Sequence, residues 1–210
     1  MNAMPAPRPV LFLVSAPSGA GKTTLCKRLL EEFPELRFSV SCTTRAPRVG
    51  ERDGVDYVFL DRAAFEREIA RHAFLEYAEV YGNYYGTRVS FVAETLRQGG
   101  SVLLDVDVQG ARLIRAALQR EEMDDILVSA YCDVFVFPPS LISLRERLET
   151  RGKDAPEVIE RRLQHAQTEM AEAGQYAYQL VNADLDTAYH ALKSIYVAAR
   201  HRTWGAAEPQ

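Results

Sequence analysis

The sequence predicts an α/β fold built on a mainly parallel central sheet. Short apolar runs recur along the chain without polar interruption, as strands buried on both faces require. Segments with helical periodicity alternate with these runs, an order typical of parallel sheets with crossover helices. The first apolar run, residues 10–14, leads directly into a glycine-rich turn and then into a helical segment. The expected architecture is a three-layer sandwich, with helices on both faces of the sheet.

The strands and helices expected to form this core lie in residues 10–40 and 98–203. Predicted strands cover residues 10–14, 38–41, 101–107, 130–137 and 178–181. Predicted helices cover residues 22–33, 111–119, 141–150, 156–173 and 185–202. Pro138 and Pro139 end the fourth strand, because proline cannot donate to a sheet ladder. The acidic stretch near residues 121–125 is expected to be a solvated loop.

The middle of the chain differs in character, because its elements are short and charged turns separate them. Strands are expected at 57–60 and 74–81, and helices at 61–71 and 90–97. We therefore predict a small inserted α+β subdomain over residues 41–97, which divides a core of residues 10–40 and 98–203. Residues 1–9 contain three prolines and are expected to form a loose leader.

Composition excludes several classes of protein. The 210 residues fit one domain, and the net charge of −4 disfavours a nucleic-acid binder. No apolar stretch is long enough to span a bilayer, and no signal peptide is apparent. Cys26, Cys42 and Cys132 show neither disulfide nor metal-ligand spacing, so free thiols and a cytoplasmic location are expected. The four histidines are expected at the surface, since none has a partner at catalytic spacing.

The segment Ala16-Pro-Ser-Gly-Ala-Gly-Lys-Thr23 has phosphate-loop spacing from its second glycine onward, whereas Ala16 stands where the usual pattern begins with glycine. Its glycines allow backbone N–H groups to converge on a phosphate, and the following helix adds the positive end of its dipole. Lys22 would reach the β- and γ-phosphates of a nucleotide, and Thr23 would bind Mg²⁺. The predicted ATP-binding residues here are Ala16, Pro17, Ser18, Gly19, Ala20, Gly21, Lys22, Thr23 and Thr24. The motif alone leaves a GTPase, an ATPase or a kinase open, and a plain glycine-rich turn is the simpler alternative.

Asp105 and Asp107 follow a buried strand, at the sheet edge that faces the ligand crevice in open α/β folds. Asp105 is the predicted carboxylate for Mg²⁺. Two strand-end turn residues are the alternative interpretation. Arg45 and Arg48 share one proline-containing loop, where two guanidinium groups could clamp a phosphate. Loop arginines are otherwise commonly surface charges.

Four motifs, in order along the chain, resemble those of guanylate kinases. They are the phosphate loop, Ser41-Cys-Thr-Thr-Arg-Ala-Pro-Arg-Val-Gly-Glu51, Gly82-Asn-Tyr-Tyr-Gly-Thr87 and Asp105-Val-Asp-Val-Gln-Gly110. The resemblance extends over most of the chain. It implies that the phosphate of GMP is held by Arg45, Arg48, Tyr57 and Tyr85. It implies that guanine is read by Ser41, Glu76, Thr87 and Asp107, with the Glu76 carboxylate accepting from the N1–H and N2–H₂ donors of the base.

The resemblance also implies a helical lid over residues 145–165. Arg147 and Arg151 are four residues apart on one helical face, and Arg162 lies on the next predicted helix. By the family pattern Arg147 lies against adenine, Arg151 and Arg162 contact the transferring phosphates, and Asn182 lines the adenine pocket. Exposed helical arginines are common, so this set depends on the resemblance.

The activity that the resemblance implies is transfer of the ATP γ-phosphoryl group to GMP, with Mg²⁺. Lys22, Arg45, Arg151 and Arg162 are the expected catalytic residues. A non-catalytic guanylate-kinase-like binding module is the alternative, although such domains typically lose the loop lysine and lid arginines. A kinase for another phosphorylated acceptor and a P-loop GTPase are further rivals. Ala16, Val108 and the longer segment 119–130 depart from the usual family pattern, and that segment leaves a loop or a homo-oligomer contact open.

Overall fold

A computed structural model describes residues 6–150 and 155–203 of the chain, and its centre is a five-stranded sheet. The strand order is β2–β7–β1–β8–β9, and every neighbouring pair is parallel. The strands are β1 (Leu11–Ser15), β2 (Leu36–Phe38), β7 (Ser101–Asp105), β8 (Tyr131–Phe137) and β9 (Tyr178–Val181). This sheet confirms the predicted α/β fold.

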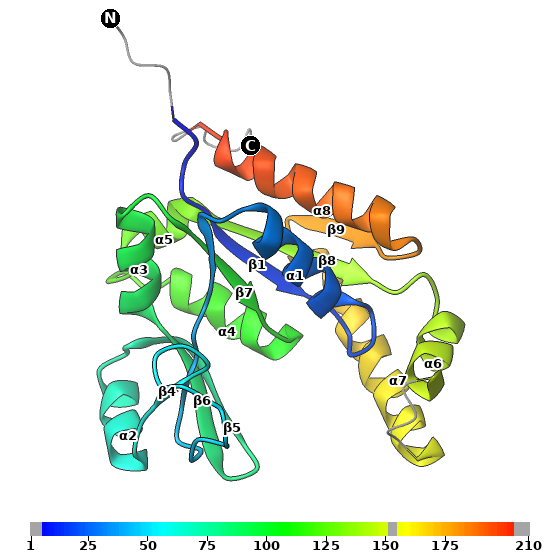
Figure 1. Cartoon of the computed structure of the whole chain (residues 1–210), viewed down its shortest axis with the longest axis horizontal. Helices are drawn as coiled ribbons and strands as arrows, with labels where there is room; N and C mark the ends of the chain where they lie inside the picture. The colour runs from blue at the N-terminus through cyan, green and yellow to red at the C-terminus, as the bar shows by residue number, and fades with distance from the viewer. Residues whose placement is uncertain (1–5, 151–154, 204–210) are drawn as a thin grey trace, which may run out of the picture.

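Alternate residues of β1 divide the core into two layers. Figure 1 shows the helices that cover the two faces of the sheet. Phe12 and Val14 pack against α1 (Lys22–Glu32) and α8 (Leu185–Arg200). Leu11 and Leu13 pack on the other face of the sheet, in the second core cluster. That cluster is covered by α3 (Val89–Arg97), α4 (Val108–Leu118) and α5 (Asp125–Ala130). Since successive strand residues point to opposite faces, this alternation produces the predicted three-layer sandwich.

A second, four-stranded sheet in the order β4–β3–β6–β5 forms the small unit inserted between β2 and β7. Its elements are β3 (Cys42–Thr43), β4 (Val58–Phe59), α2 (Arg62–Ala70), β5 (Phe74–Val80) and β6 (Asn83–Arg88). The Phe65 ring from α2 stacks between those of Phe74 and Tyr84, at centroid distances of 4.4 and 5.2 Å. Leu75 belongs instead to the core cluster shared with α4. The start of β5 is therefore fixed to the main core.

Two further helices, α6 (Leu141–Thr150) and α7 (Pro156–Ala171), form a hairpin-like pair with its own small core. Buried residues of that core include Leu144, Leu148 and Leu163. In Figure 1 this pair stands across from the small sheet, with the phosphate loop between the two. A short 3₁₀ helix, η1 (Ala173–Gln175), connects α7 to β9.

Several predicted boundaries were wrong. The second strand ends at Phe38, where residues 38–41 were predicted, and α4 begins at Val108 instead of residue 111. Asp107 is the N-cap of α4, because its carboxylate accepts from the backbone N–H of Gly110 at 2.8 Å. The strand β6 was missed, and so was α5, which begins at the last residue of the acidic stretch 121–125 that was expected to be a loop. Asp124 caps α5, and Leu127 beneath it is fully buried.

Other sequence predictions can be compared with the burial pattern. The three cysteines are buried free thiols, and the four histidines are exposed, as expected. Residues 6–9 of the predicted leader carry no helix or strand. Across residues 6–150 and 155–203, none of the helices has the length and apolar character needed to cross a bilayer.

Candidate active site

The phosphate loop joins β1 to α1 and has the backbone geometry that its glycines permit. Gly19 and Gly21 have φ angles of +99° and +96°, in the left-handed region that favours glycine. Ala16 is absent from the positive-φ residues in the described parts of the chain, so alanine is compatible with that position. Gly21 caps α1 without a side-chain hydrogen bond, so the first N–H groups of the helix remain available to an anion.

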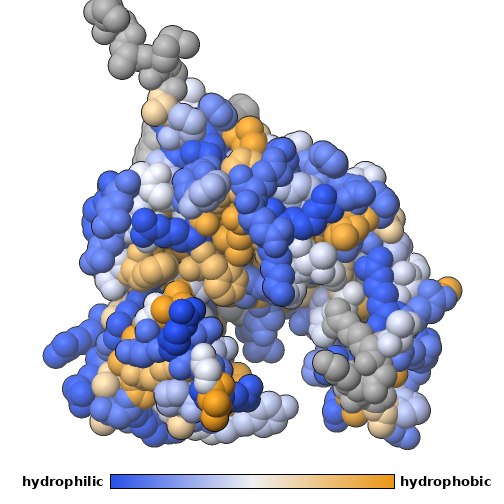
Figure 2. Space-filling model, viewed as in Figure 1, coloured by the Kyte–Doolittle hydropathy of each residue, from blue (hydrophilic) through white to orange (hydrophobic). Residues whose placement is uncertain are grey.

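A cleft of about 470 Å³ opens above this loop. Figure 2 shows the molecule hollowed here, between the small sheet on the left and the α6–α7 pair on the right. The cleft brings together most of the predicted phosphate-site residues, namely Ala16, Pro17, Ser18, Gly19, Gly21, Lys22, Thr23, Thr24, Asp105 and Asp107. Ala20 is buried, and its carbonyl accepts hydrogen bonds from behind the loop.

Lys22 is held at the end of β7. Its Nζ lies 2.7 Å from Asp105 Oδ1 and donates to the carbonyl of Val106 at 2.5 Å. Each of the two charged side chains exposes 17 % of its surface. The predicted Lys22 and Asp105 therefore meet in the cleft as an ion pair, with Thr23 exposed beside them.

Glu169 of α7 also lines this cleft, and it was not predicted from the sequence. Burial raises the pKa of its carboxyl, and Asp107 adds to the effect, whereas Lys22 and His165 oppose it. Glu169 follows Arg162 by seven residues, which is two helical turns and hence nearly the same face. This spacing is the signal that could have identified Glu169 once Arg162 was assigned to the site.

The predicted guanine-reading residues meet on the small sheet. Glu76 on β5 pairs directly with Thr87 on β6, next to an irregularity in the ladder after Phe74. The Thr87 hydroxyl donates to Glu76 Oε1 at 2.7 Å. Cys42 of β3 lies opposite Gly86, which places Ser41 at the same end of the sheet as Thr87. The structure thus brings Glu76 and Thr87 into contact and places Ser41 at the same end of the small sheet.

The environment of Glu76 disfavours the ionised form of its carboxyl group. Burial raises the pKa of this carboxyl, the Thr87 hydrogen bond opposes the shift, and the nearby Asp107 charge adds to it. Asp107 also faces the phosphate cleft. The charge of Asp107 therefore acts on Glu76, while its side chain lines the phosphate-loop cleft.

Arg45 lies beside the two predicted tyrosines. The centre of its guanidinium is 5.4 Å from the Tyr57 ring centroid, and the Tyr57 and Tyr85 rings are 6.1 Å apart, edge to face. A hydrogen bond from Thr43 Oγ1 to the Tyr84 carbonyl joins the start of this loop to β6. Arg48 is exposed three residues further along the same loop. Arg45 and the two tyrosines therefore form a compact basic and phenolic cluster.

A second hollow of about 530 Å³ lies behind the phosphate loop, between α6 and the start of α8. Arg147 donates to the carbonyls of Asn182 at 2.9 Å and Ala20 at 3.4 Å. The buried Asn182 side chain donates to the same Ala20 carbonyl at 2.7 Å. Both predicted residues therefore hold the loop from behind and line this hollow. Of the other lid residues, Arg162 lies on α7 and Arg151 lies outside the described residues.

The Gly21→Ala variant tests the contact between the loop and Asn182. A Cβ at Gly21 would lie 2.2 Å from Asn182 Nδ2, and φ there is +96°. The Gly99→Ala variant is the matched control, because φ is +82° and nothing lies within 4 Å. Both variants pay the left-handed strain, but only Gly21→Ala also displaces Asn182 from a buried hydrogen bond. We expect Gly21→Ala to melt about 3–8 °C below Gly99→Ala. Equal melting temperatures would contradict this account.

Comparisons with known proteins agree with this geometry. The family described as Guanylate kinase matches residues 7–199. Proteins named guanylate kinase from Symbiobacterium thermophilum and Alkalilimnicola ehrlichii are 47% and 48% identical to the chain. These matches cover 94% and 91% of this chain and 89% and 90% of the relatives. A crystal structure of guanylate kinase from Anaplasma phagocytophilum superposes with a TM-score of 0.67 at 30% identity, covering 96% of this chain and 91% of that one. The chain therefore belongs to the guanylate kinase family.

Proposed function

We propose that the chain transfers the γ-phosphoryl group of ATP to GMP, giving ADP and GDP, with Mg²⁺ as the metal. One observation carries this proposal: Asp107 lines the phosphate-loop cleft, and its charge also raises the pKa of Glu76 in the buried Glu76–Thr87 pair. A donor triphosphate and a guanine acceptor can therefore occupy adjacent sites, as direct transfer between two nucleotides requires.

The donor side is proposed to hold ATP along the loop. The uncapped N–H groups of α1 would bind phosphate oxygens, and Lys22 would move from Asp105 to the β- and γ-phosphates. Arg147 and Asn182 would bound the adenine in the hollow behind the loop. Hydrogen bonds to the Ala20 carbonyl already hold both in place, so little ordering is needed on binding.

The residues at the cleft fit a Mg²⁺ ion. Thr23 supplies a hydroxyl and Asp105 a carboxylate, and oxygen ligands of this kind suit a hard cation. In the described parts of the chain, no group of three or more His, Cys, Asp or Glu side chains is arranged to hold a metal. Phosphate oxygens and water would therefore complete the coordination. When bound, the ion neutralises charge on the β- and γ-phosphates.

The acceptor side is proposed to bind GMP across the small sheet. Arg45 and Arg48 would clamp its phosphate, with the hydroxyls of Tyr57 and Tyr85 donating hydrogen bonds. Ser41, Glu76, Thr87 and Asp107 would contact the guanine end. Ionised Glu76 accepts hydrogen bonds, which matches the N1–H and N2–H₂ donors of guanine. Adenine lacks this pair of donors and would leave the buried carboxylate with the Thr87 hydroxyl but without the two hydrogen bonds from the base, so the site would select guanine.

Transfer itself needs alignment and charge neutralisation more than covalent help. Lys22, Arg45, Arg151 and Arg162 are the proposed catalytic residues, because each would offset negative charge on the phosphates. The attacking GMP oxygen is largely ionised at neutral pH, so no general base is required. We propose residues 41–97 as the GMP-binding subdomain and 145–165 as a lid, and closure of both would exclude water from the γ-phosphate.

The assay for this function couples ADP release to a spectroscopic readout, with ATP, Mg²⁺ and one acceptor at a time. Turnover with GMP and at most traces with AMP, CMP and UMP is the expected result. Folded protein that turns over none of the four would favour the non-catalytic binding module instead. The buried free thiols agree with a reducing compartment, so we infer that the reaction takes place in the cytoplasm.

A further inference from the structure

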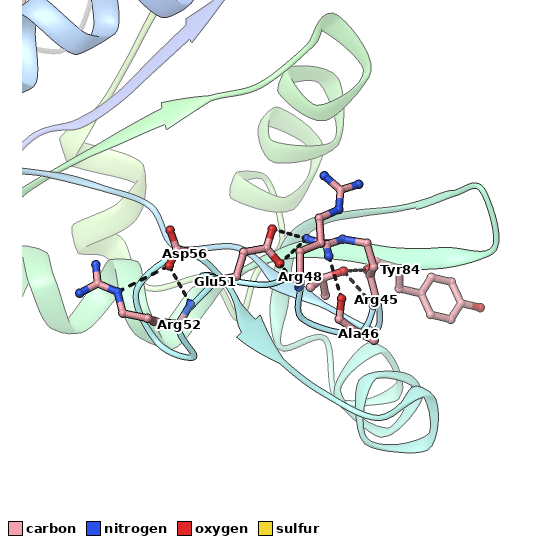
Figure 3. Close-up of polar contacts among 8 residues, drawn as sticks. Arg45, Ala46, Arg48, Glu51, Arg52, Asp56 and Tyr84 are labelled. Carbon is pink, nitrogen blue, oxygen red and sulfur yellow. Dashed lines mark hydrogen bonds and ion pairs between the residues drawn. The ribbon is translucent and has the colours of Figure 1, made fainter.

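Glu51 is the last residue of the loop 45–51, which we call the arginine loop because it carries Arg45 and Arg48. The sequence assigned no role to Glu51, yet its carboxylate makes several hydrogen bonds within this loop. Its two carboxylate oxygens accept from one terminal nitrogen of Arg45 at 2.8 and 2.9 Å. One of these oxygens also accepts from the backbone N–H of Arg48 at 2.7 Å. Figure 3 shows Glu51 reaching back into the loop, while Arg52 pairs with Asp56 on its outer side.

The loop between Arg45 and Glu51 packs little of its surface against the rest of the protein. Residues 46–50 are all exposed, and Val49 is fully exposed to solvent. Gly50 has a φ of +91°, and a Cβ there would find nothing within 4 Å. The N–H of Glu51 donates to the Arg48 carbonyl at 3.0 Å, so Glu51 and Arg48 bond reciprocally and close the turn. Because burial contributes so little, the geometry of this segment depends on the Glu51 carboxylate.

The same carboxylate fixes the direction of the Arg45 guanidinium. One terminal nitrogen donates to Glu51 and the other to the Ala46 carbonyl at 2.7 Å. Only 16 % of the Arg45 side chain and 20 % of Glu51 are exposed, so the pair is shielded from solvent. Hydrogen bonding to Glu51 raises the pKa of Arg45, and the Arg45 hydrogen bond lowers that of Glu51. Both groups therefore stay ionised, with the guanidinium held against Tyr57.

We propose that Glu51 is a positioning residue for the acceptor phosphate, which it serves by holding the Arg45 guanidinium and the Arg48 turn in their binding geometry. This inference rests on the proposed function, in which Arg45 and Arg48 clamp the phosphate of GMP. Glu51 touches no substrate in this scheme and acts through the two arginines. An arginine that is ordered before binding loses less side-chain entropy when the phosphate arrives.

If Glu51 instead competed with the acceptor phosphate, its removal would change the affinity for GMP in the opposite direction. If Glu51 only competed with the phosphate for Arg45, its removal would free a cation and tighten the binding of GMP. Removing a negative charge beside two arginines also favours an anion on electrostatic grounds alone. Weaker GMP binding after removal of Glu51 would therefore have to come from lost positioning, since the charge effect works in the other direction.

The experiment measures dissociation constants for GMP and for guanosine by titration calorimetry, and KM for ATP by the coupled assay. The Glu51→Ala variant should bind GMP about tenfold more weakly, because the ordering of two side chains is lost. Binding of guanosine and KM for ATP should stay within about twofold of wild type, since neither ligand uses the arginine loop. The Glu51→Gln variant keeps a hydrogen-bond acceptor and should recover much of the loss.

Glu66→Ala is the matched control, because it also removes a carboxylate from an arginine of the small sheet unit. Glu66 pairs with Arg62 at 3.0 Å on α2, outside the proposed site. A cycle with Arg45→Ala adds a second test, since Glu51→Ala should weaken GMP binding less when Arg45 is already absent.

The possible results separate the positioning role of Glu51 from the proposed arginine clamp. GMP binding by Glu51→Ala that equals or exceeds wild type would overturn the positioning role. An equal loss for guanosine would overturn it as well, because the defect would then be general to the small sheet unit. Wild-type protein that binds guanosine but not GMP would contradict the arginine clamp of the proposed function. A wild type that binds GMP, with a normal Glu51→Ala variant, would contradict this inference alone.

Discussion

Replacing Lys22 by methionine is expected to lower kcat for GMP phosphorylation by about 10³-fold, the usual cost of removing one preorganised electrostatic contact. Methionine approximates the length of the lysine stem but carries no charge. The α1 N–H groups and the loop backbone would remain to bind ATP. We therefore expect KM for ATP to rise much less than kcat falls, because the charge on the transferring group is greatest in the transition state.

The Lys22→Met experiment needs a control lysine and a correction for the ion pair that is lost. Lys27 on the same helix is exposed, so Lys27→Met removes a lysine from α1 without touching the cleft. Lys22→Met also leaves Asp105 without its 2.7 Å partner, which can lower stability. The double variant Lys22→Met/Asp105→Asn removes that unpaired charge. A kcat for Lys22→Met within tenfold of wild type, in folded protein, would contradict the proposed role.

The core of the fold was predictable because its strands are buried on both faces. The continuous apolar run of β1 and the helical periodicity of α1 and α8 each indicate one element type, and packing agrees with both. The strand β6 could not be found this way. Asn83–Arg88 contains two polar ends and a glycine, and it is a strand because β5 and β3 pair with it. Tertiary pairing overrides local preference in such a segment.

The site was predictable to the extent that short motifs carry it. Glycines at 19 and 21 indicate a loop that needs positive φ, and that geometry is present. The hydrogen bond between Arg45 and Glu51 lies within the motif at residues 41–51. The two residues are six apart in an irregular loop, which has no periodicity from which a contact could be predicted. Glu169 is distant in sequence from the phosphate loop, so apart from its helical spacing to Arg162 nothing local indicates that the placement of α7 brings it to the cleft. Contacts between elements of this kind depend on packing, which local sequence does not encode.

Glu76→Gln is expected to lower kcat/KM for GMP by about 10²–10³-fold, because two hydrogen bonds to a charged acceptor are weakened or lost. The amide keeps an oxygen for the Thr87 hydroxyl, but its NH₂ group would face a guanine donor. KM for ATP should stay near its wild-type value. Glu79→Gln is the matched control, since Glu79 is an exposed residue of the same strand.

The same variant should make the ligand-free protein more stable at neutral pH. Burial raises the pKa of the Glu76 carboxyl above its ordinary value of 4.5, so the folded state binds this proton more tightly than the unfolded state. The ionised form is therefore unfavourable to folding above the raised pKa, and the penalty disappears as pH falls below about 4.5. At pH 7 we expect Glu76→Gln to melt about 2–4 °C above wild type, with the difference shrinking toward zero in acid.

Thermal unfolding of wild type, Glu76→Gln and Glu79→Gln from pH 4 to pH 8, without nucleotide, measures this effect. Glu79→Gln makes the same change of carboxylate to amide at an exposed position of β5 and is the reference for the Glu76→Gln difference. A Glu76→Gln variant that is less stable than wild type at pH 7 would mean that the carboxylate stabilises the fold. The activity loss would then follow from damage to the sheet and not from guanine recognition. Higher stability with lower activity is the combination expected of a charge that is kept for binding at the expense of folding.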